Sequence, residues 1–153
     1  MGRLMKSAWA ALVGSLLLAV GPAAAETADQ AAVSRLLHGT FDRPGTELVV
    51  SPIVVSHPYA IAGWTQGEMG GRALLRRKDQ DWVLILCAGD GIKSRDGLVG
   101  AGVPDAQAVA IARDLASEEA KLPPRQVAMF SRFEGIMMME GGGEREPARP
   151  GGR

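Results

Sequence analysis

Methionine is the residue type in this chain with the most distinctive chemical potential, because its thioether sulfur is a soft ligand that suits Cu(I). Three methionines stand together as Met137, Met138 and Met139, and Met69 lies apart from them in a glycine-rich stretch. Three consecutive residues of a regular helix or strand cannot all face one ion, since their side chains point in different directions. We therefore expect two of the triplet to act together, with His57 or Met69 completing a metal site. The alternative is that the triplet fills the end of the core, where methionine packs well into irregular gaps.

Cys87 is the only cysteine of the chain, so it cannot form an internal disulfide bond. It could support the metal site as a ligand, or act as a nucleophile with His57 or His38 as its base. It ends an apolar run and no nucleophile motif surrounds it, which favours a buried, unreactive thiol. The complete set of candidate metal ligands is Met137, Met138, Met139, Met69, His57 and Cys87.

The stretch 66–71 contains three glycines but lacks the Lys-Ser/Thr pair and the helix that a phosphate-binding loop requires. We interpret it as a hairpin loop whose glycines adopt positive φ. Glu68 and Arg72 could line a pocket beside it, but a solvent-exposed hairpin tip is the interpretation we favour. Asp90 stands between two glycines and is expected to form a local hydrogen bond to the backbone of a turn.

Four runs between Glu47 and Cys87 have the composition of β-strands, and short turns separate them. The strands are predicted at 48–55, 59–65, 72–78 and 82–87. Pro52 removes a backbone donor from the first strand, which therefore belongs at an edge of the sheet. The fourth strand is apolar on both faces, so we expect it in the interior of the sheet. One of its faces is predicted to carry Trp82, Leu84 and Leu86, and the other Val83, Ile85 and Cys87.

Helical patterns precede and follow these strands. Residues 26–38 form an amphipathic helix that Gly39 is expected to end. After the sheet, Ser94 is expected to cap a short helix, Pro104 to open a second, and Pro123-Pro124 to start a third. In the second of these, the predicted buried stripe is Val109, Ala112, Leu115 and Ala116. Its predicted solvated face is Arg113, Asp114, Glu118, Glu119 and Lys121. The predicted fold class is α+β: an N-terminal helix, a four-stranded antiparallel β-meander, and C-terminal helices packed on the sheet.

The first 25 residues have the order of a secretory signal peptide. Arg3 and Lys6 precede an apolar run, Ala8–Val20, and Ala23-Ala24-Ala25 supplies a cleavage site. The run is shorter than the roughly 20 residues that cross a bilayer, so we predict cleavage after Ala25 and no membrane span thereafter. The remaining chain is predicted to be one domain, 26–139, and a disordered Gly-, Pro- and charge-rich tail, 140–153. Export through a cleaved signal peptide predicts a periplasmic protein.

Charge gives no reason to expect nucleic acid as a partner. Removal of Arg3 and Lys6 from the 17 basic residues leaves 15, against 17 acidic residues. The exported chain is therefore nearly neutral, and its fold must be held by its core rather than by disulfide bonds.

Several long strings in this chain resemble a family of small exported bacterial proteins described as copper uptake system-associated proteins. These strings are 41–45 (FDRPG), 60–75 (AIAGWTQGEMGGRALL), 82–91 (WVLILCAGDG) and 101–104 (AGVP). The resemblance covers Thr40–Phe133. It implies a periplasmic role beside copper import, with a copper chaperone or copper transporter components as partners. It brings no established set of copper ligands or catalytic residues.

Three functions follow as hypotheses. The first is an accessory protein of copper uptake that binds Cu(I) weakly, or binds a copper-handling partner, and is not an enzyme. The second is an interaction module without a metal, docking through the strand edge at 48–55 or through the tryptophan and glycine loop. The third is a periplasmic enzyme that uses Cys87 as its nucleophile.

Overall fold

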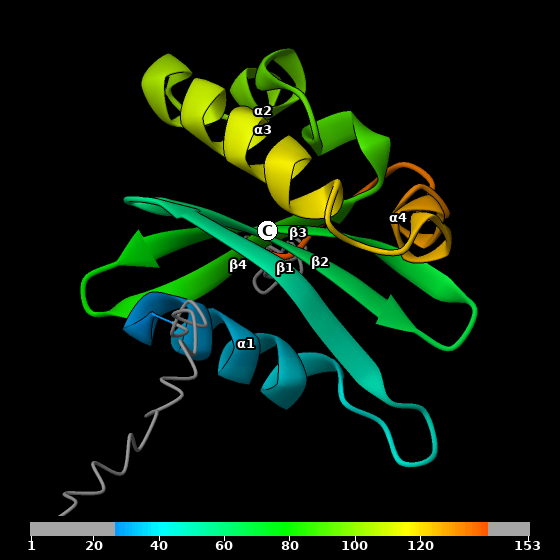
Figure 1. Cartoon of the computed structure of the whole chain (residues 1–153). Helices are drawn as coiled ribbons and strands as arrows, with labels where there is room; N and C mark the ends of the chain where they lie inside the picture. The colour runs from blue at the N-terminus through cyan, green and yellow to red at the C-terminus, as the bar shows by residue number, and fades with distance from the viewer. Residues whose placement is uncertain (1–26, 141–153) are drawn as a thin grey trace, which may run out of the picture.

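The computed structural model describes residues 27–140 (Figure 1). The predicted signal peptide and the predicted tail beyond Glu140 lie outside the described residues. Glu140, which the sequence assigns to the tail, is the last described residue, and its carboxylate accepts a hydrogen bond of 2.8 Å from Arg76. No helix within 27–140 is long and apolar enough to cross a membrane.

The predicted α+β class is confirmed, and so is the antiparallel sheet. The helices are α1 (Ala28–Phe41), η1 (Asp90–Ile92), α2 (Arg95–Gly100), α3 (Asp105–Glu119) and α4 (Pro124–Phe130). The strands are β1 (Leu48–Ser56), β2 (Tyr59–Gln66), β3 (Met69–Lys78), β4 (Asp81–Ala88) and β5 (Ile136–Met138), in the sheet order β1-β2-β3-β4-β5. The sequence pattern missed β5, because three residues are too few to show a strand period.

Helices cover both faces of the sheet (Figure 1). On one side α1 packs over a core cluster that includes Val33, Leu37, Leu75 and Leu84. On the other side α2 and α3 pack over a second cluster of apolar residues. The members of that second cluster are Val54, Ile61, Leu74, Leu86, Ala88, Ile92, Leu98, Val103, Ala108, Ile111 and Leu115. The sheet is thus the middle layer of three.

The interior position of β4, between β3 and β5, confirms the expectation drawn from its two apolar faces. The predicted division of those faces was wrong for Leu86 and for Cys87, which packs with Trp82 and Leu84 rather than with Ile85. The register pairs Leu84 with Leu75 and Leu86 with Leu74, so one residue of β4, Ile85, is inserted without a partner on β3. Such a β-bulge reverses the alternation of side chains beyond it. Leu86 therefore joins the cluster under α3, whereas Leu84 packs under α1.

The glycine-rich stretch is only partly a loop. Gly67 has a φ of +59° and turns the hairpin as predicted, but β3 begins at Met69 and includes the next two glycines. Gly70 allows a close approach, because a β-carbon there would lie 2.8 Å from the carbonyl oxygen of Met129 in α4. The need at this position is for space rather than for positive φ.

For the helices after the sheet, the predicted cap at Ser94 is confirmed, but the predicted buried face of α3 is only partly correct. Ser94 caps α2 as predicted, by accepting a hydrogen bond from the Gly97 amide at 3.2 Å. Pro104 is the cap residue of α3 rather than a residue of its first turn. The buried stripe of α3 is Ala108, Ile111 and Leu115. Val109 and Ala116, both predicted to be buried, are exposed, because they lie beside that stripe rather than in it.

Helix α1 does not end at Gly39, since the pattern of hydrogen bonds continues to Phe41. Gly39 is exposed, and a β-carbon there would meet nothing within 4 Å. Glycine inside a helix costs about 0.5–1 kcal/mol relative to alanine. Gly39→Ala is therefore expected to raise the free energy of unfolding by about that amount. Urea unfolding followed by circular dichroism measures it, and a decrease would show that the helix ends at Gly39 after all.

Candidate functional site

A pocket of about 350 Å³ opens where the end of α1 meets β2, β3, β4 and β5. We call it the sulfur pocket, because its lining includes the sulfur-containing side chains of Met69, Cys87 and Met137. Its lining is Phe41, Arg43, Thr46, Trp64, Gln66, Met69, Cys87, Phe133 and Met137. The structure therefore brings together three of the six candidate ligands.

Strand pairing positions these three sulfur-containing side chains. Cys87 and Met137 are direct partners on the antiparallel strands β4 and β5. Directly opposite residues point to the same face of the sheet, with their β-carbons about 4.5–5.5 Å apart. Met69 begins β3 and pairs with Gln66 at the end of β2. The short strand β5, which the sequence did not reveal, is what places Met137 beside Cys87.

The pocket has a buried end and an open end. Cys87 is 3% exposed, whereas Met69 and Met137 are about half exposed. Two aromatic side chains, Trp64 and Phe133, meet edge to face with their ring centroids 5.9 Å apart. The lining of the pocket is thus mainly apolar, and the thiol of Cys87 lies at its buried end.

Burial raises the pKa of the Cys87 thiol to about 11. The thiol is therefore protonated at neutral pH, which disfavours a nucleophilic role. Neither histidine supplies a base, since His38 and His57 are absent from the pocket lining. His38 instead lies on the last turn of α1, with its Nδ1 3.0 Å from Oδ2 of Asp42.

His57 lies at the turn between β1 and β2, away from the sulfur pocket. Its Nε2 is 2.7 Å from Oδ2 of Asp29 in α1, and its ring centroid is 5.8 Å from that of Trp82. Because Trp82 stands near the start of β4 and Cys87 near its end, His57 lies at the other end of this strand from Cys87. Asp29 also accepts hydrogen bonds from Arg77 and from the indole of Trp82. This cluster fastens the N-terminal half of α1 to the sheet.

Of the other two methionines of the triplet, Met138 points to the opposite face of the sheet from Met137, and Met139 follows the end of β5. Met138 pairs with Leu86, is 58% exposed, and does not line the pocket. Met139 is partly buried against the cluster that contains Cys87, and its amide donates to the carbonyl of Ile85 at 2.8 Å. As expected, the triplet does not face one site as a unit, and Met137 is the one member of the triplet that lines the pocket.

Sequence reasoning missed the burial of Arg72, which is 1% exposed and is the only charged residue in the buried core of the described chain. Its guanidinium donates to both carboxylate oxygens of Glu119, at 2.7 and 2.8 Å, and to Asp90 at 3.1 Å. The prediction of an exposed hairpin tip was wrong for Arg72, and the prediction of a solvated Glu119 was wrong with it. An arginine between glycine and alanine in an apolar strand was the available signal.

Asp90 joins this cluster to two further elements. Its carboxylate accepts hydrogen bonds from Lys93 at 2.8 Å and from Ser131 at 2.7 Å, as well as from Arg72. The hydrogen bond from Lys93, helped by those from Ser131 and Arg72, lowers the pKa of Asp90 to about 2. The predicted local turn bond of Asp90 is therefore only part of its role, because it also links η1 to the end of α4.

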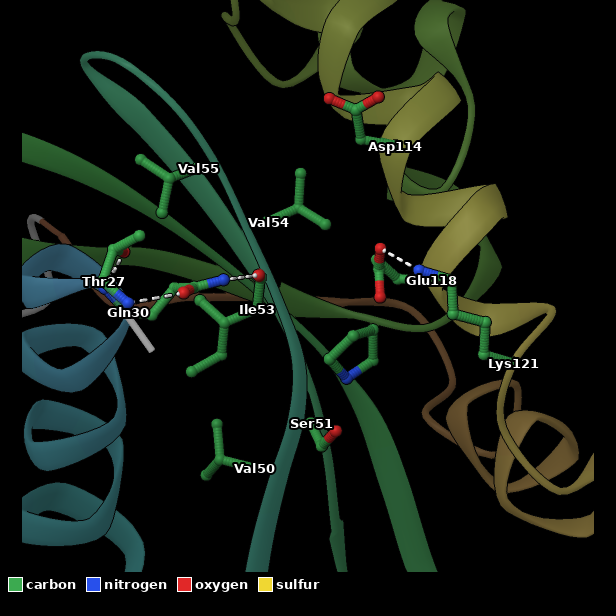
Figure 2. A pocket seen from close by; sticks show the side chains of 11 residues that line it. Thr27, Gln30, Val50, Ser51, Ile53, Val54, Val55, Asp114, Glu118 and Lys121 are labelled. Carbon is green, nitrogen blue, oxygen red and sulfur yellow. Dashed lines mark hydrogen bonds and ion pairs between the residues drawn. The ribbon is translucent and has the colours of Figure 1, made fainter. Parts of the chain in front are cut away.

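A second hollow, a groove of about 610 Å³, runs along the outer edge of β1 between α1 and α3 (Figure 2). The predicted edge position of this strand is confirmed. The edge is partly closed, because the side-chain amide of Gln30 donates to the carbonyl of Ile53 at 2.9 Å and Pro52 lacks a donor. The register also shifts between Val50 and Ile53, which interrupts a regular ladder. These are devices that protect an edge strand from added strands.

Comparison with known proteins gives no relative from which to transfer a function: no family model, no curated protein and no solved structure matches this chain.

Proposed function

We propose that this protein is a periplasmic accessory protein of copper uptake that binds Cu(I) weakly in the sulfur pocket. The observation that carries the proposal is the convergence of Met69, Cys87 and Met137 on one mainly apolar pocket. The resemblance to copper uptake system-associated proteins and the predicted signal peptide agree with it. A copper chaperone or copper transporter components are the proposed partners.

Sulfur ligands suit Cu(I) because the ion is soft, and two neutral thioethers bind it without losing a proton. The Cys87 thiol must lose its proton to become a strong ligand, and its raised pKa makes this costly at neutral pH. A site of this kind binds its ion weakly, and the bound ion remains available for transfer. Partial exposure of Met69 and Met137 would let a partner reach the ion.

Titration with Cu(I) against a chromophoric competitor chelator tests the proposal. We expect the exported form to bind one Cu(I), and Met69→Leu and Met137→Leu each to lower the affinity about tenfold or more. Leucine conserves volume at these half-exposed positions, so the fold is expected to remain. The matched control is Met138→Leu, because Met138 lies on the same strand but outside the pocket. Equal affinities for all three variants, or no bound Cu(I) in the parent protein, would overturn the proposal.

The second candidate function is the interaction module without a metal of its own, for which the groove beside β1 is the specific observation. The walls of that groove carry charges that are already paired, Glu118 with Lys121 and Asp114 with Arg113. Together with the protected strand edge, these pairs make the groove a weaker candidate than the sulfur pocket. One binding experiment distinguishes the two functions. If the protein is an interaction module without a metal, a purified copper-handling partner must still bind to it when a chelator holds the Cu(I).

A further inference from the structure

The connection between α1 and β1, residues 42–47, forms one wall of the sulfur pocket. We call it the strap. It contributes Arg43 and Thr46 to the lining, and Phe41 immediately before it contributes a third side chain. All six residues of the strap are exposed, so none of its side chains is buried in the core. Its internal structure is one bridge, in which the Thr46 amide donates to the carbonyl of Arg43 at 3.2 Å.

One side chain of the sheet holds the strap at Thr46 and the end of α1 at Phe41, the residue immediately before the strap. The amide nitrogen of Gln66, at the end of β2, donates to the carbonyl of Phe41 at 2.9 Å and to that of Thr46 at 3.2 Å. Gln66 is itself part of the pocket lining. Loss of this one amide therefore removes two bonds that hold the wall in place.

We propose that the strap is a gate over the sulfur pocket and that the Gln66 amide is its latch. Cys87 lines the pocket yet is 3% exposed, so a ligand or reagent reaches its thiol only when part of the wall moves. The strap has no buried side chain, is tied to α1 at Asp42 through His38, and is tied to the sheet at Thr46 through Gln66. Such a segment opens more easily than a strand paired on both sides. The role of the gate in copper exchange rests on the proposed function, whereas its opening does not.

Alkylation of Cys87 measures the opening without any copper. The native full-length exported chain is treated with N-ethylmaleimide at a single pH, and the modified fraction is followed by mass spectrometry. We expect Gln66→Leu to react about tenfold faster than the parent protein, because both latch bonds are lost at constant side-chain volume. The matched control is Gln30→Leu, which also removes two hydrogen bonds of a side-chain amide outside the pocket: the bond that Gln30 donates to Ile53 and the bond that it accepts from the Thr27 amide. Its rate is expected to stay within about twofold of the parent rate.

Two results would overturn the gate: equal alkylation rates in Gln66→Leu and the parent protein, or equal acceleration by Gln66→Leu and Gln30→Leu. If Gln66→Leu does not fold, the alkylation rate of the parent protein still tests whether the strap opens locally. Its alkylation rate should change little with low urea concentrations if the strap opens locally, because local opening exposes little surface. A steep rise in rate with urea would mean that Cys87 reacts only after global unfolding. Faster alkylation without Cu(I) binding would keep the gate and remove the proposed function.

Discussion

Replacement of Arg72 with alanine is expected to lower the free energy of unfolding by about 3–5 kcal/mol, since it leaves buried charge without a partner. The guanidinium holds both oxygens of Glu119, whose side chain is only 11% exposed. It also donates to the carbonyl of Gly89 and stacks on the ring of Phe130, with its central carbon 5.4 Å from the ring centroid. Urea unfolding of the variant and the parent protein, at the same pH, measures the change.

The position of Arg72 explains why the effect should exceed that of other ion pairs in the chain. Its partners come from α3 and from η1, and Asp90 in turn accepts a hydrogen bond from Ser131 at the end of α4. Three elements on one face of the sheet are therefore fastened to β3 through a single side chain. Exposed pairs are worth about 0–1 kcal/mol, because water and salt screen them.

Arg113→Ala is the matched control for this prediction. Arg113 pairs with Asp114 on α3, and its side chain is 72% exposed. Its loss is expected to change the free energy of unfolding far less than the loss of Arg72, because solvent screens the pair. The double variant Arg72→Met/Glu119→Leu tests the cause, because removing both charges should recover much of the stability lost by Arg72→Ala. If Arg72→Ala were no more harmful than Arg113→Ala, the buried cluster would not be holding the helices to the sheet.

The sequence predicted those parts of the fold that depend on local periodicity. The four long strands, the edge position of β1 and the cap at Ser94 all follow from residues close together in the chain. The burial of Arg72 does not follow in this way, because it depends on Glu119, a residue 47 positions away. Long-range pairs of this kind leave almost no local signal.

The candidate site shows the same limit. Residue chemistry selected six possible ligands, and the fold brings Met69, Cys87 and Met137 to one pocket while placing His57 and Met138 elsewhere. The separation depends on β5 and on its register with β4, in which Met137 is opposite Cys87. A three-residue strand has too few positions for its pattern to predict that register. The strap and its latch at Gln66 are likewise contacts between distant segments.

Gly97→Ala is expected to destabilise the protein by about 3 kcal/mol, at the upper end of what overpacking usually costs. A β-carbon built at Gly97 in α2 would overlap the carbonyl oxygen of Gly91 and lie 2.9 Å from its carbonyl carbon. That carbonyl belongs to η1, where Ile92 is 1% exposed and Asp90 holds Arg72. The backbone of η1 therefore cannot move aside without disturbing both the core and the buried cluster. Thermal and urea unfolding measure the loss.

Gly100→Ala separates this steric cost from the helix-forming tendency of alanine. Gly100 lies in the same six-residue helix, and a β-carbon there would meet nothing within 4 Å. Both substitutions exchange glycine for alanine within α2, so both gain at most about 0.5–1 kcal/mol from reduced freedom of the unfolded chain. The difference between the two variants therefore reports the contact between α2 and η1. If the two variants were equally stable, η1 would have to yield freely to α2, and Asp90 could not then be a rigid support for Arg72.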